Sequence, residues 1–126
     1  MIFISDKIEV KDSPIEGRGV FAKEDIKANE VIECSHFTIL EQSFPQIDNK
    51  LKEYVFSWPK TVWGGKSVVV WGFGSIYNHS RDNNADWVTD EENNLFKFFT
   101  IKDVKKGEEI CTNYGEAYEK IVKTVK

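Results

Sequence analysis

Two cysteines and two histidines are the side chains of this 126-residue sequence best suited to bind a transition metal. Cys34, His36, His79 and Cys111 would provide the sulfur and nitrogen ligands that zinc prefers. None of the short ligand spacings of a zinc finger or zinc knuckle occurs among them. Two cysteines are also too few for a disulfide scaffold, and the sequence leaves open whether they form a single bridge. We therefore expect no metal site, and we expect both thiols to be reduced and buried.

A second candidate metal site is the acidic stretch after residue 81. Asp82, Asn84 and Asp86 occupy the first, third and fifth positions of a calcium-loop pattern. The sixth position is Trp87 in place of glycine, and the twelfth is Asn93 in place of glutamate. Because the loop lacks both its sharp turn and its bidentate carboxylate, the stretch is typical of a solvated turn.

Residues 17–22, Gly-Arg-Gly-Val-Phe-Ala, match the dinucleotide-binding pattern G-x-G-x-x-[G/A]. That pattern binds a pyrophosphate only where a strand precedes it and a helix follows it. Here Ser13-Pro14 indicates a turn before the glycines, and residues 20–22 continue as a strand. A dinucleotide site is therefore excluded. The glycine pair still allows the backbone to approach either another strand or a ligand closely.

The four tryptophans, Trp58, Trp63, Trp71 and Trp87, allow two interpretations. Tryptophan is usually found packed in a core or an interface. Aromatic rings also suit a channel for a lysine, because the aliphatic stem packs against them and the ammonium group is favoured over their faces.

Short strands separated by turns are expected to position these residues. We predict strands at 8–11, 19–22, 30–34, 36–41, 67–71, 85–89, 95–101 and 109–112. A spacing of about ten residues favours a mainly β fold over alternating βαβ units. Ile47, Leu51, Tyr54 and Val55 recur at helical intervals, which predicts a short helix over 46–56 that ends near Pro59. A second helix is predicted from Glu116 onward.

Composition indicates one compact domain, residues 1–126, with 40% hydrophobic, 30% charged and 13% aromatic residues. Seventeen basic residues against 21 acidic ones give a net charge of −4, and only Arg18 and Arg81 are arginines. This balance argues against direct binding of nucleic acid and favours a basic partner. No apolar run is long enough for a membrane span or a signal peptide. We expect a cytoplasmic protein, or a nuclear one in a host cell if the source is viral or a secreted bacterial protein.

Three ordered motifs and one intervening segment give the sequence a family resemblance. The motifs lie at 17–22, at 72–80 (Gly-Phe-Gly-Ser-Ile-Tyr-Asn-His-Ser) and at 107–115, where Gly-Glu-Glu-Ile leads into Asn-Tyr-Gly; the segment is 51–58. In this order the chain resembles the SET-domain protein-lysine methyltransferases over essentially its whole length. It is most similar to their small, stand-alone bacterial and viral members.

The resemblance implies a mainly β fold of small curved sheets with one or two short helices. It also implies a pseudoknot, in which the C-terminal segment threads beneath the loop at 78–80. The cofactor would be S-adenosylmethionine, bound by residues of the first and second motifs and of the 51–58 segment: Gly17, Arg18, Gly19, Tyr54, Asn78 and His79. The residues implied for the substrate-lysine channel are Tyr77, Trp87, Thr112 and Tyr114. Tyr54 and Tyr77 could each be a channel wall or a core residue.

Methyl transfer to an amine needs a neutral nitrogen. A lysine with a pKa of about 10.4 is neutral in only about one molecule in 2,500 at pH 7. Removal from water in an aromatic channel and the nearby sulfonium charge both disfavour the ammonium form. No dedicated general base is then required, and alignment of nitrogen, methyl and sulfur remains. The resemblance implies that Tyr114 performs this alignment.

The sequence departs from many family members in two respects. It lacks the zinc-binding cysteine clusters that flank the domain, so the channel would be closed by the segment after Gly115 or by a second subunit in a homodimer. Thr112 stands where many members carry a Phe or Tyr that influences the number of methyl groups added, which leaves that number open. We hypothesise that Trp87 fills the space, which a changed ratio of methylated products in Trp87→Phe would test.

The predicted function is S-adenosylmethionine-dependent methylation of a lysine in a basic protein, such as a histone, a ribosomal protein or a nucleoid protein. The alternatives are a catalytically silent binding or dimerisation module with the same fold, and a sensor that binds the cofactor without turnover. The intact residues Asn78, His79, Ser80 and Tyr114 argue against the silent module.

Overall fold

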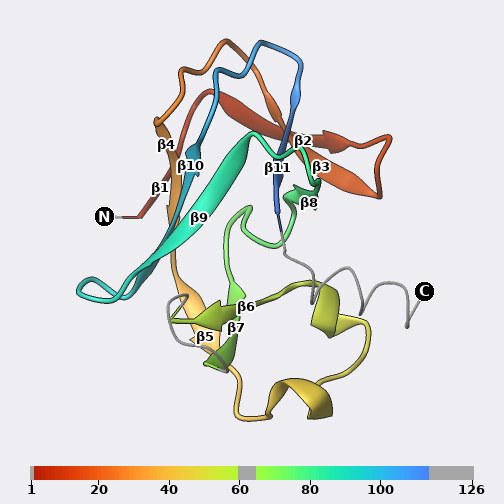
Figure 1. Ribbon diagram of the computed structural model, residues 1–126, viewed down its shortest axis with the longest axis vertical. Coiled ribbons are helices and arrows are strands. Elements are labelled where there is room, and N and C mark those ends of the chain that lie inside the picture. Colours follow the sequence, from red (N-terminus) through yellow and green to blue (C-terminus); the bar gives the residue numbers. More distant parts are fainter. Residues whose placement is uncertain (1, 60–64, 114–126) are drawn as a thin grey trace.

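The computed structural model describes residues 2–59 and 65–113 of the chain. These residues form three small sheets (Figure 1). The first contains β1 (Phe3–Ile4), β4 (Val31–Ser35), β10 (Leu95–Thr100) and β9 (Ala85–Asp90), in that order. The second contains β2 (Ile8–Asp12), β3 (Arg18–Ala22), β11 (Glu109–Thr112) and β8 (Asn78–His79). The third contains β5 (Phe37–Ile39), β7 (Lys66–Val70) and β6 (Val55–Trp58). The predicted mainly β fold of small sheets with few helices is confirmed.

Most predicted strands are present with bounds shifted by at most one residue, because a local pattern indicates where a strand lies better than where it ends. The strand predicted over 36–41 is shorter, covering Phe37–Ile39, and β1 and β8 were not predicted. Trp63, Tyr114 and the helix predicted from Glu116 lie outside the described residues. Within the described ranges, no helix has the length and apolar character needed to cross a membrane.

The helix predicted over 46–56 is wrong. The chain there forms two single 3-10 turns, η1 (Phe44–Gln46) and η2 (Leu51–Glu53), and then enters β6. Each residue of β6 pairs with β7, from Val55 opposite Val69 to Trp58 opposite Lys66. Because Val, Phe and Trp favour strands, pairing with the next strand along the chain outweighed the local helical spacing.

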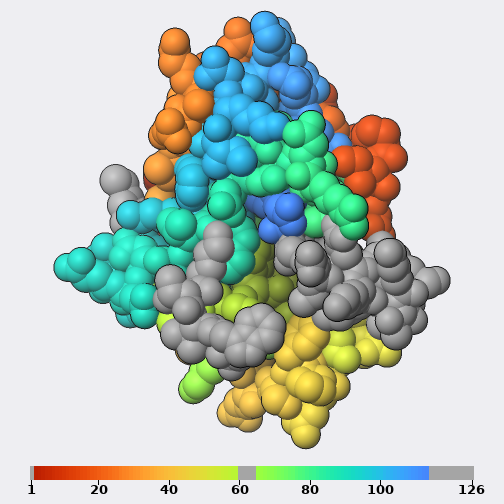
Figure 2. Space-filling view, viewed as in Figure 1, coloured from red at the N-terminus to blue at the C-terminus, as the bar shows by residue number. Residues whose placement is uncertain are grey.

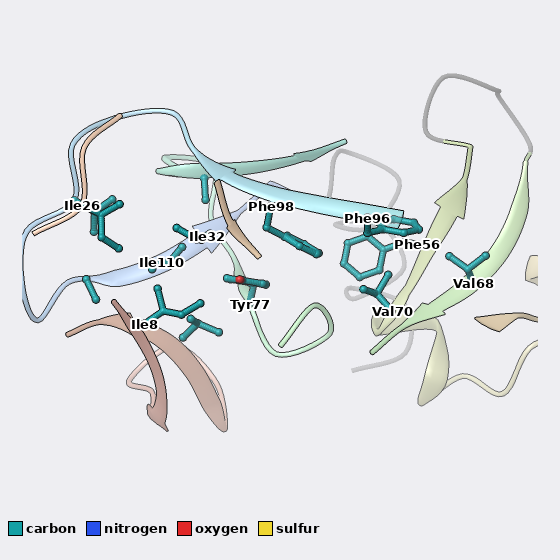
Figure 3. Close-up of a cluster of buried hydrophobic side chains, with 14 residues drawn as sticks. Ile8, Ile26, Ile32, Phe56, Val68, Val70, Tyr77, Phe96, Phe98 and Ile110 are labelled. Atoms are coloured by element: carbon teal, nitrogen blue, oxygen red, sulfur yellow. The ribbon is translucent and has the colours of Figure 1, made fainter. Parts of the chain in front are cut away.

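A single aromatic core joins the sheets. Phe96 and Phe98 of β10 are both fully buried, and they meet Phe56 of β6 at ring-centroid distances of 5.5 and 6.0 Å. Figure 3 shows Phe56 and Phe96 on one side of the core and Ile8 and Ile110 on the other, with Phe98 and Tyr77 between the two groups. The same core therefore supports all three sheets.

β11 lies at the centre of the second sheet. It pairs antiparallel with β3 and parallel with β8, where Cys111 is opposite Asn78 and Thr112 is opposite His79. Figure 2 shows the end of β11, in dark blue, reaching the surface at the centre of one face beside the green segment around β8. The second and third motifs, distant in sequence, are therefore neighbours in space. The pseudoknot stays a prediction.

Candidate active site

A pocket of about 200 Å³ lies where three separate segments meet. The turn between β2 and β3 provides the first wall, η2 and the residue after it provide the second, and the segment that enters β8 provides the third. The lining residues are Glu16, Gly17, Arg18, Glu53, Tyr54, Ser75, Ile76 and Asn78. Four of the six residues predicted for cofactor binding therefore line a single pocket: Gly17, Arg18, Tyr54 and Asn78.

The two glycines of the first motif are needed for different structural reasons. Gly17 closes the β2–β3 turn with a φ of +50°, a conformation that L side chains rarely adopt, and open space surrounds the position of a Cβ. Gly19 has an ordinary backbone, but a Cβ there would overlap the Glu109 carboxylate. Gly17 therefore shapes the turn, whereas Gly19 leaves room for the Glu109 carboxylate and the Asn78 amide.

Asn78 joins the second motif to the first. Its Nδ2 group donates to the carbonyl oxygens of Glu16 and Arg18, each at 3.2 Å, and to Glu109 Oε2 at 2.7 Å. The other oxygen of the same carboxylate, Glu109 Oε1, accepts a hydrogen bond of 2.7 Å from Ser13 Oγ. Glu109 thus holds the β2–β3 turn and β8 against β11.

The groups at this pocket fit an amino acid joined to a nucleoside. The carbonyl oxygens beside Asn78 are acceptors suited to an ammonium group. The Arg18 guanidinium, whose side chain is 76% exposed and lies 3.9 Å from Asp12 Oδ1, can reach a carboxylate. The exposed ring of Tyr54 offers an aromatic face for a base or a sulfonium. The residues present therefore fit S-adenosylmethionine.

The two remaining predicted cofactor residues lie next to this pocket. Gly19 is buried in β3, and its neighbour Arg18 lines the pocket. His79 follows Asn78 in β8, is half-buried and pairs with Thr112. Neither residue is part of the pocket lining, and their contribution to binding stays a prediction.

The predicted channel residues occupy two environments. Thr112 is fully buried at the end of β11, and its hydroxyl has no hydrogen-bond partner among the described residues. Trp87 is half-buried, stacks on Phe96 at 5.3 Å and meets Phe56 edge to face at 5.1 Å. Tyr114 lies outside the described residues. The structure therefore places Thr112 beside β8 and Trp87 in the aromatic core, and their roles in a channel stay predictions.

Tyr77 is a core residue. Its side chain is fully buried, its ring stacks on Phe98 at 4.8 Å, and its hydroxyl donates to Glu33 Oε1 at 2.7 Å. Burial raises the pKa of Tyr77 well above its ordinary value, and the Glu33 charge adds to this effect. The sequence left open whether Tyr77 is a channel wall or a core residue, and the structure shows it in the core.

Sequence reasoning missed the carboxylates around the site, namely Glu16, Glu33, Glu53 and Glu109. A signal was present for two of them. Glu33 interrupts the apolar strand Val-Ile-Glu-Cys-Ser, and Glu109 stands in the third motif before buried residues. A charged residue at a core position of a strand usually indicates a buried hydrogen-bonding role.

Both cysteines are free and buried, as predicted. Burial raises the pKa of the Cys111 thiol to about 12, with a smaller contribution from the Glu109 charge. Among the described residues, no group of three or more His, Cys, Asp or Glu side chains is placed to hold a metal ion.

The comparison with protein families matches residues 17–115 to the SET domain. The chain belongs to the SET domain family. It is 34% identical over 116 residues to the histone-lysine N-methyltransferase of Schizosaccharomyces pombe that is specific for H3 lysine-37, covering 90% of this chain and 76% of the relative. Among solved structures, it is similar to a candidate histone methyltransferase of Plasmodium falciparum, with a TM-score of 0.71 and 28% identity over 90% of this chain and 96% of the other. The SET domain match includes the pocket's glycine turn, Asn78, Glu109 and Tyr114.

Proposed function

We propose that this enzyme, a protein-lysine N-methyltransferase, takes its methyl group from S-adenosylmethionine and transfers it to a lysine of a basic protein such as a histone. The observation that carries the proposal is the pocket at which the β2–β3 turn and Asn78 meet, with Glu109 joining them. β11, which pairs beside this pocket, ends two residues before Tyr114. The proposed cofactor site thus lies next to the strand that leads to the predicted catalytic residue.

In this proposal the pocket residues bind and orient the cofactor. The carbonyls of Glu16 and Arg18 accept from its ammonium group, the Arg18 side chain pairs with its carboxylate, and Tyr54 packs against its rings. When bound, the cofactor supplies a methyl group on a positively charged sulfur. Gly17 gives the turn its left-handed φ, and so shapes the backbone at this wall of the pocket.

The chain's part in the transfer is to deliver a neutral lysine nitrogen in line with that methyl group. Removal of the ammonium group from water lowers the pKa of the lysine. The hydroxyl of Tyr114 then holds the nitrogen in line, which gives the step the advantage of a fixed geometry. No side chain is required as a dedicated base, and Thr112 and Trp87 are proposed to limit the space around the amine.

Two observations support a basic protein as the substrate. The chain carries a net charge of −4. The S. pombe relative acts on histone H3, as its name states. An acidic surface attracts a lysine-rich segment and increases its local concentration. We propose the cytoplasm as the place of action, or a host nucleus if the chain acts on host chromatin.

The decisive experiment combines cofactor binding with methyl transfer. Purified protein is titrated with S-adenosylmethionine by calorimetry, and labelled methyl transfer is followed to core histones and to a basic-protein extract. The wild type is expected to bind and to transfer label. Tyr114→Phe is expected to bind the cofactor normally and to lose transfer, which separates alignment from binding. Binding without transfer to either substrate would favour the silent module or the sensor, and absence of binding would contradict the proposed function.

A further inference from the structure

A buried carboxylate lies behind the candidate cofactor pocket. Glu33, in the middle of β4, is fully buried, and no lysine or arginine of the described residues forms an ion pair with it. An ionised carboxylate in such a place is costly unless several hydrogen bonds compensate for the lost water. The hydrogen-bond donors to Glu33 therefore indicate its structural role.

Three of its four hydrogen-bond donors come from one short segment. Glu33 Oε1 accepts from the Tyr77 hydroxyl at 2.7 Å, and Oε2 accepts from the backbone N–H of Phe73 at 2.9 Å. The backbone N–H of Gly74 is a further donor to the carboxylate. The fourth donor, Ser35 Oγ, belongs to β4 itself. The Glu33 side chain, from the first sheet, is thus hydrogen-bonded to three residues of the segment 72–77, which connects β7 to β8.

The conformation of this segment depends on its contact with Glu33. Gly72 has a φ of +80°, and a Cβ at this position would lie 2.5 Å from Glu33 Oε2 and 2.8 Å from Ser35 Oγ. Only a glycine allows the backbone to come this close to the carboxylate. The segment is therefore shaped around Glu33.

The opposite side of the same segment faces the candidate cofactor pocket. Ser75, Ile76 and Asn78 line the pocket, whereas Tyr77 between them points into the core. Figure 3 shows the Tyr77 ring beside Phe98 within the core. Ser75 Oγ also donates to the carbonyl of Tyr54, at 3.1 Å, and so connects two walls of the pocket. Displacement of Tyr77 would therefore move residues on both of its sides that shape the pocket.

We propose that Glu33 is a positioning residue for the cofactor pocket, whose carboxylate fixes the segment 72–77 so that Ile76 and Asn78 form a wall of correct shape. The proposal rests on the proposed function in one respect, namely that the ligand of this pocket is S-adenosylmethionine. Glu33 does not touch the cofactor, and it acts through Tyr77 and the backbone of Phe73 and Gly74.

Two hydroxyl deletions distinguish positioning from a general contribution to stability. Tyr77→Phe and Ser35→Ala each remove one hydrogen bond to the Glu33 carboxylate. Only the first releases the segment that lines the pocket, because Ser35 belongs to β4. Ser35→Ala is therefore the matched control for Tyr77→Phe.

The two variants are compared by calorimetry with S-adenosylmethionine and by hydrogen exchange of the backbone amides of 73–78. A single hydrogen bond corresponds to about a 2- to 12-fold change in an equilibrium. Tyr77→Phe is expected to weaken cofactor binding by such a factor and to speed exchange of these amides. Ser35→Ala is expected to change both by less than about twofold.

Variants at Glu33 itself test whether the acceptor oxygens matter. In Glu33→Gln, the amide oxygen can accept from the backbone N–H groups and the amide nitrogen can donate to the Tyr77 hydroxyl. This variant is expected to keep both the exchange protection and the cofactor affinity. Glu33→Leu, of similar size, removes every acceptor and is expected to lose both. If Glu33→Leu does not fold, the comparison of Tyr77→Phe with Ser35→Ala decides.

Failure of this proposal and failure of the proposed function give different results. If the wild type binds the cofactor and Tyr77→Phe binds it equally well, or if Ser35→Ala weakens binding as much as Tyr77→Phe, Glu33 is not a positioning residue and the function stands. If the wild type does not bind S-adenosylmethionine at all, the proposed function is wrong, and the role of Glu33 in cofactor binding is wrong with it.

Discussion

At the scale of single residues, Glu109 connects three segments through one side chain. Its two oxygens accept from Ser13 and Asn78, and its position excludes a Cβ at Gly19. Together with Asn78, whose amide also donates to the carbonyls of Glu16 and Arg18, it joins the β2–β3 turn and β8 to β11. The candidate pocket therefore depends on a carboxylate that is not part of its lining.

Glu109→Ala is expected to lower the free energy of unfolding by roughly 1–3 kcal/mol, because hydrogen bonds to a charged group are lost at Ser13 and Asn78. It is also expected to weaken cofactor binding. Urea denaturation and calorimetry measure the two effects. Glu92→Ala, in the exposed turn between β9 and β10, removes the same charge and serves as the control. Equal stability of the two variants would contradict the linking role of Glu109.

Glu33 should make stability depend on pH in a direction opposite to most carboxylates. Burial raises its pKa above the ordinary 4.5, although its four hydrogen bonds oppose the shift. The folded protein therefore holds this proton more tightly than the unfolded chain does. The contribution of Glu33 to stability is fully present below about pH 4.5 and is lost as the pH rises through the folded-state pKa.

Glu33→Gln does not titrate, so the stability of this variant relative to the wild type is expected to increase with pH above about 4.5 and to level off above the folded-state pKa. Urea denaturation at a series of pH values measures the difference. Glu24→Gln, at an exposed position, corrects for the loss of one negative charge. A difference that decreases with rising pH would show that hydrogen bonding outweighs burial at Glu33.

At the scale of elements, the segment 72–77 depends on its first glycine. Gly72 and Gly107 both have positive φ values, +80° and +90°, but only Gly72 is close to other atoms. Gly107→Ala is expected to cost about 1–2 kcal/mol of stability from backbone strain alone. Gly72→Ala is expected to cost roughly 1–3 kcal/mol more, because Glu33 must also move. Equal losses in chemical denaturation would mean that the carboxylate adapts without cost.

Elements whose residues form a recognisable local pattern could be predicted from the sequence, whereas elements that depend on pairing between separate segments could not. Strands such as Glu109–Thr112 were predicted because a short run of strand residues that follows a turn signal is visible locally. The helix over 46–56 was predicted wrongly, because the pairing of β6 with β7 is not visible in a local pattern. The parallel pairing of β8 with β11 joins segments that are far apart in the sequence, and no local pattern encodes it.

The same distinction applies to the candidate site. The glycine turn and Asn78 were predicted because ordered motifs include them, and the structure places both at one pocket. Glu33 and Glu109 were missed because a buried carboxylate is defined by its partners. The partners of Glu33 come from residues 35 and 73–77, and those of Glu109 from residues 13 and 78. No local pattern brings those positions together.

At the scale of the whole molecule, the pocket and the core are two sides of the same chain segments. Tyr77 contacts Phe98 in the core, while its neighbours Ile76 and Asn78 face the pocket. β11 packs Ile110 into the core and carries Glu109 to the pocket's supporting network. At both elements, a core residue is therefore the immediate sequence neighbour of a residue that lines or supports the pocket.

The acidic character of the whole chain predicts how substrate recognition responds to salt. A net charge of −4 attracts a basic peptide over several ångströms, and dissolved ions screen this attraction. We compare two peptides that present the same lysine, one with basic and one with uncharged neighbours, at low and at moderate salt. The KM of the basic peptide is expected to rise by about 3- to 10-fold, whereas the KM of the uncharged one changes by less than about twofold. An equal rise for both peptides would show that the salt acts on the enzyme or on cofactor binding, and that charge does not select the substrate.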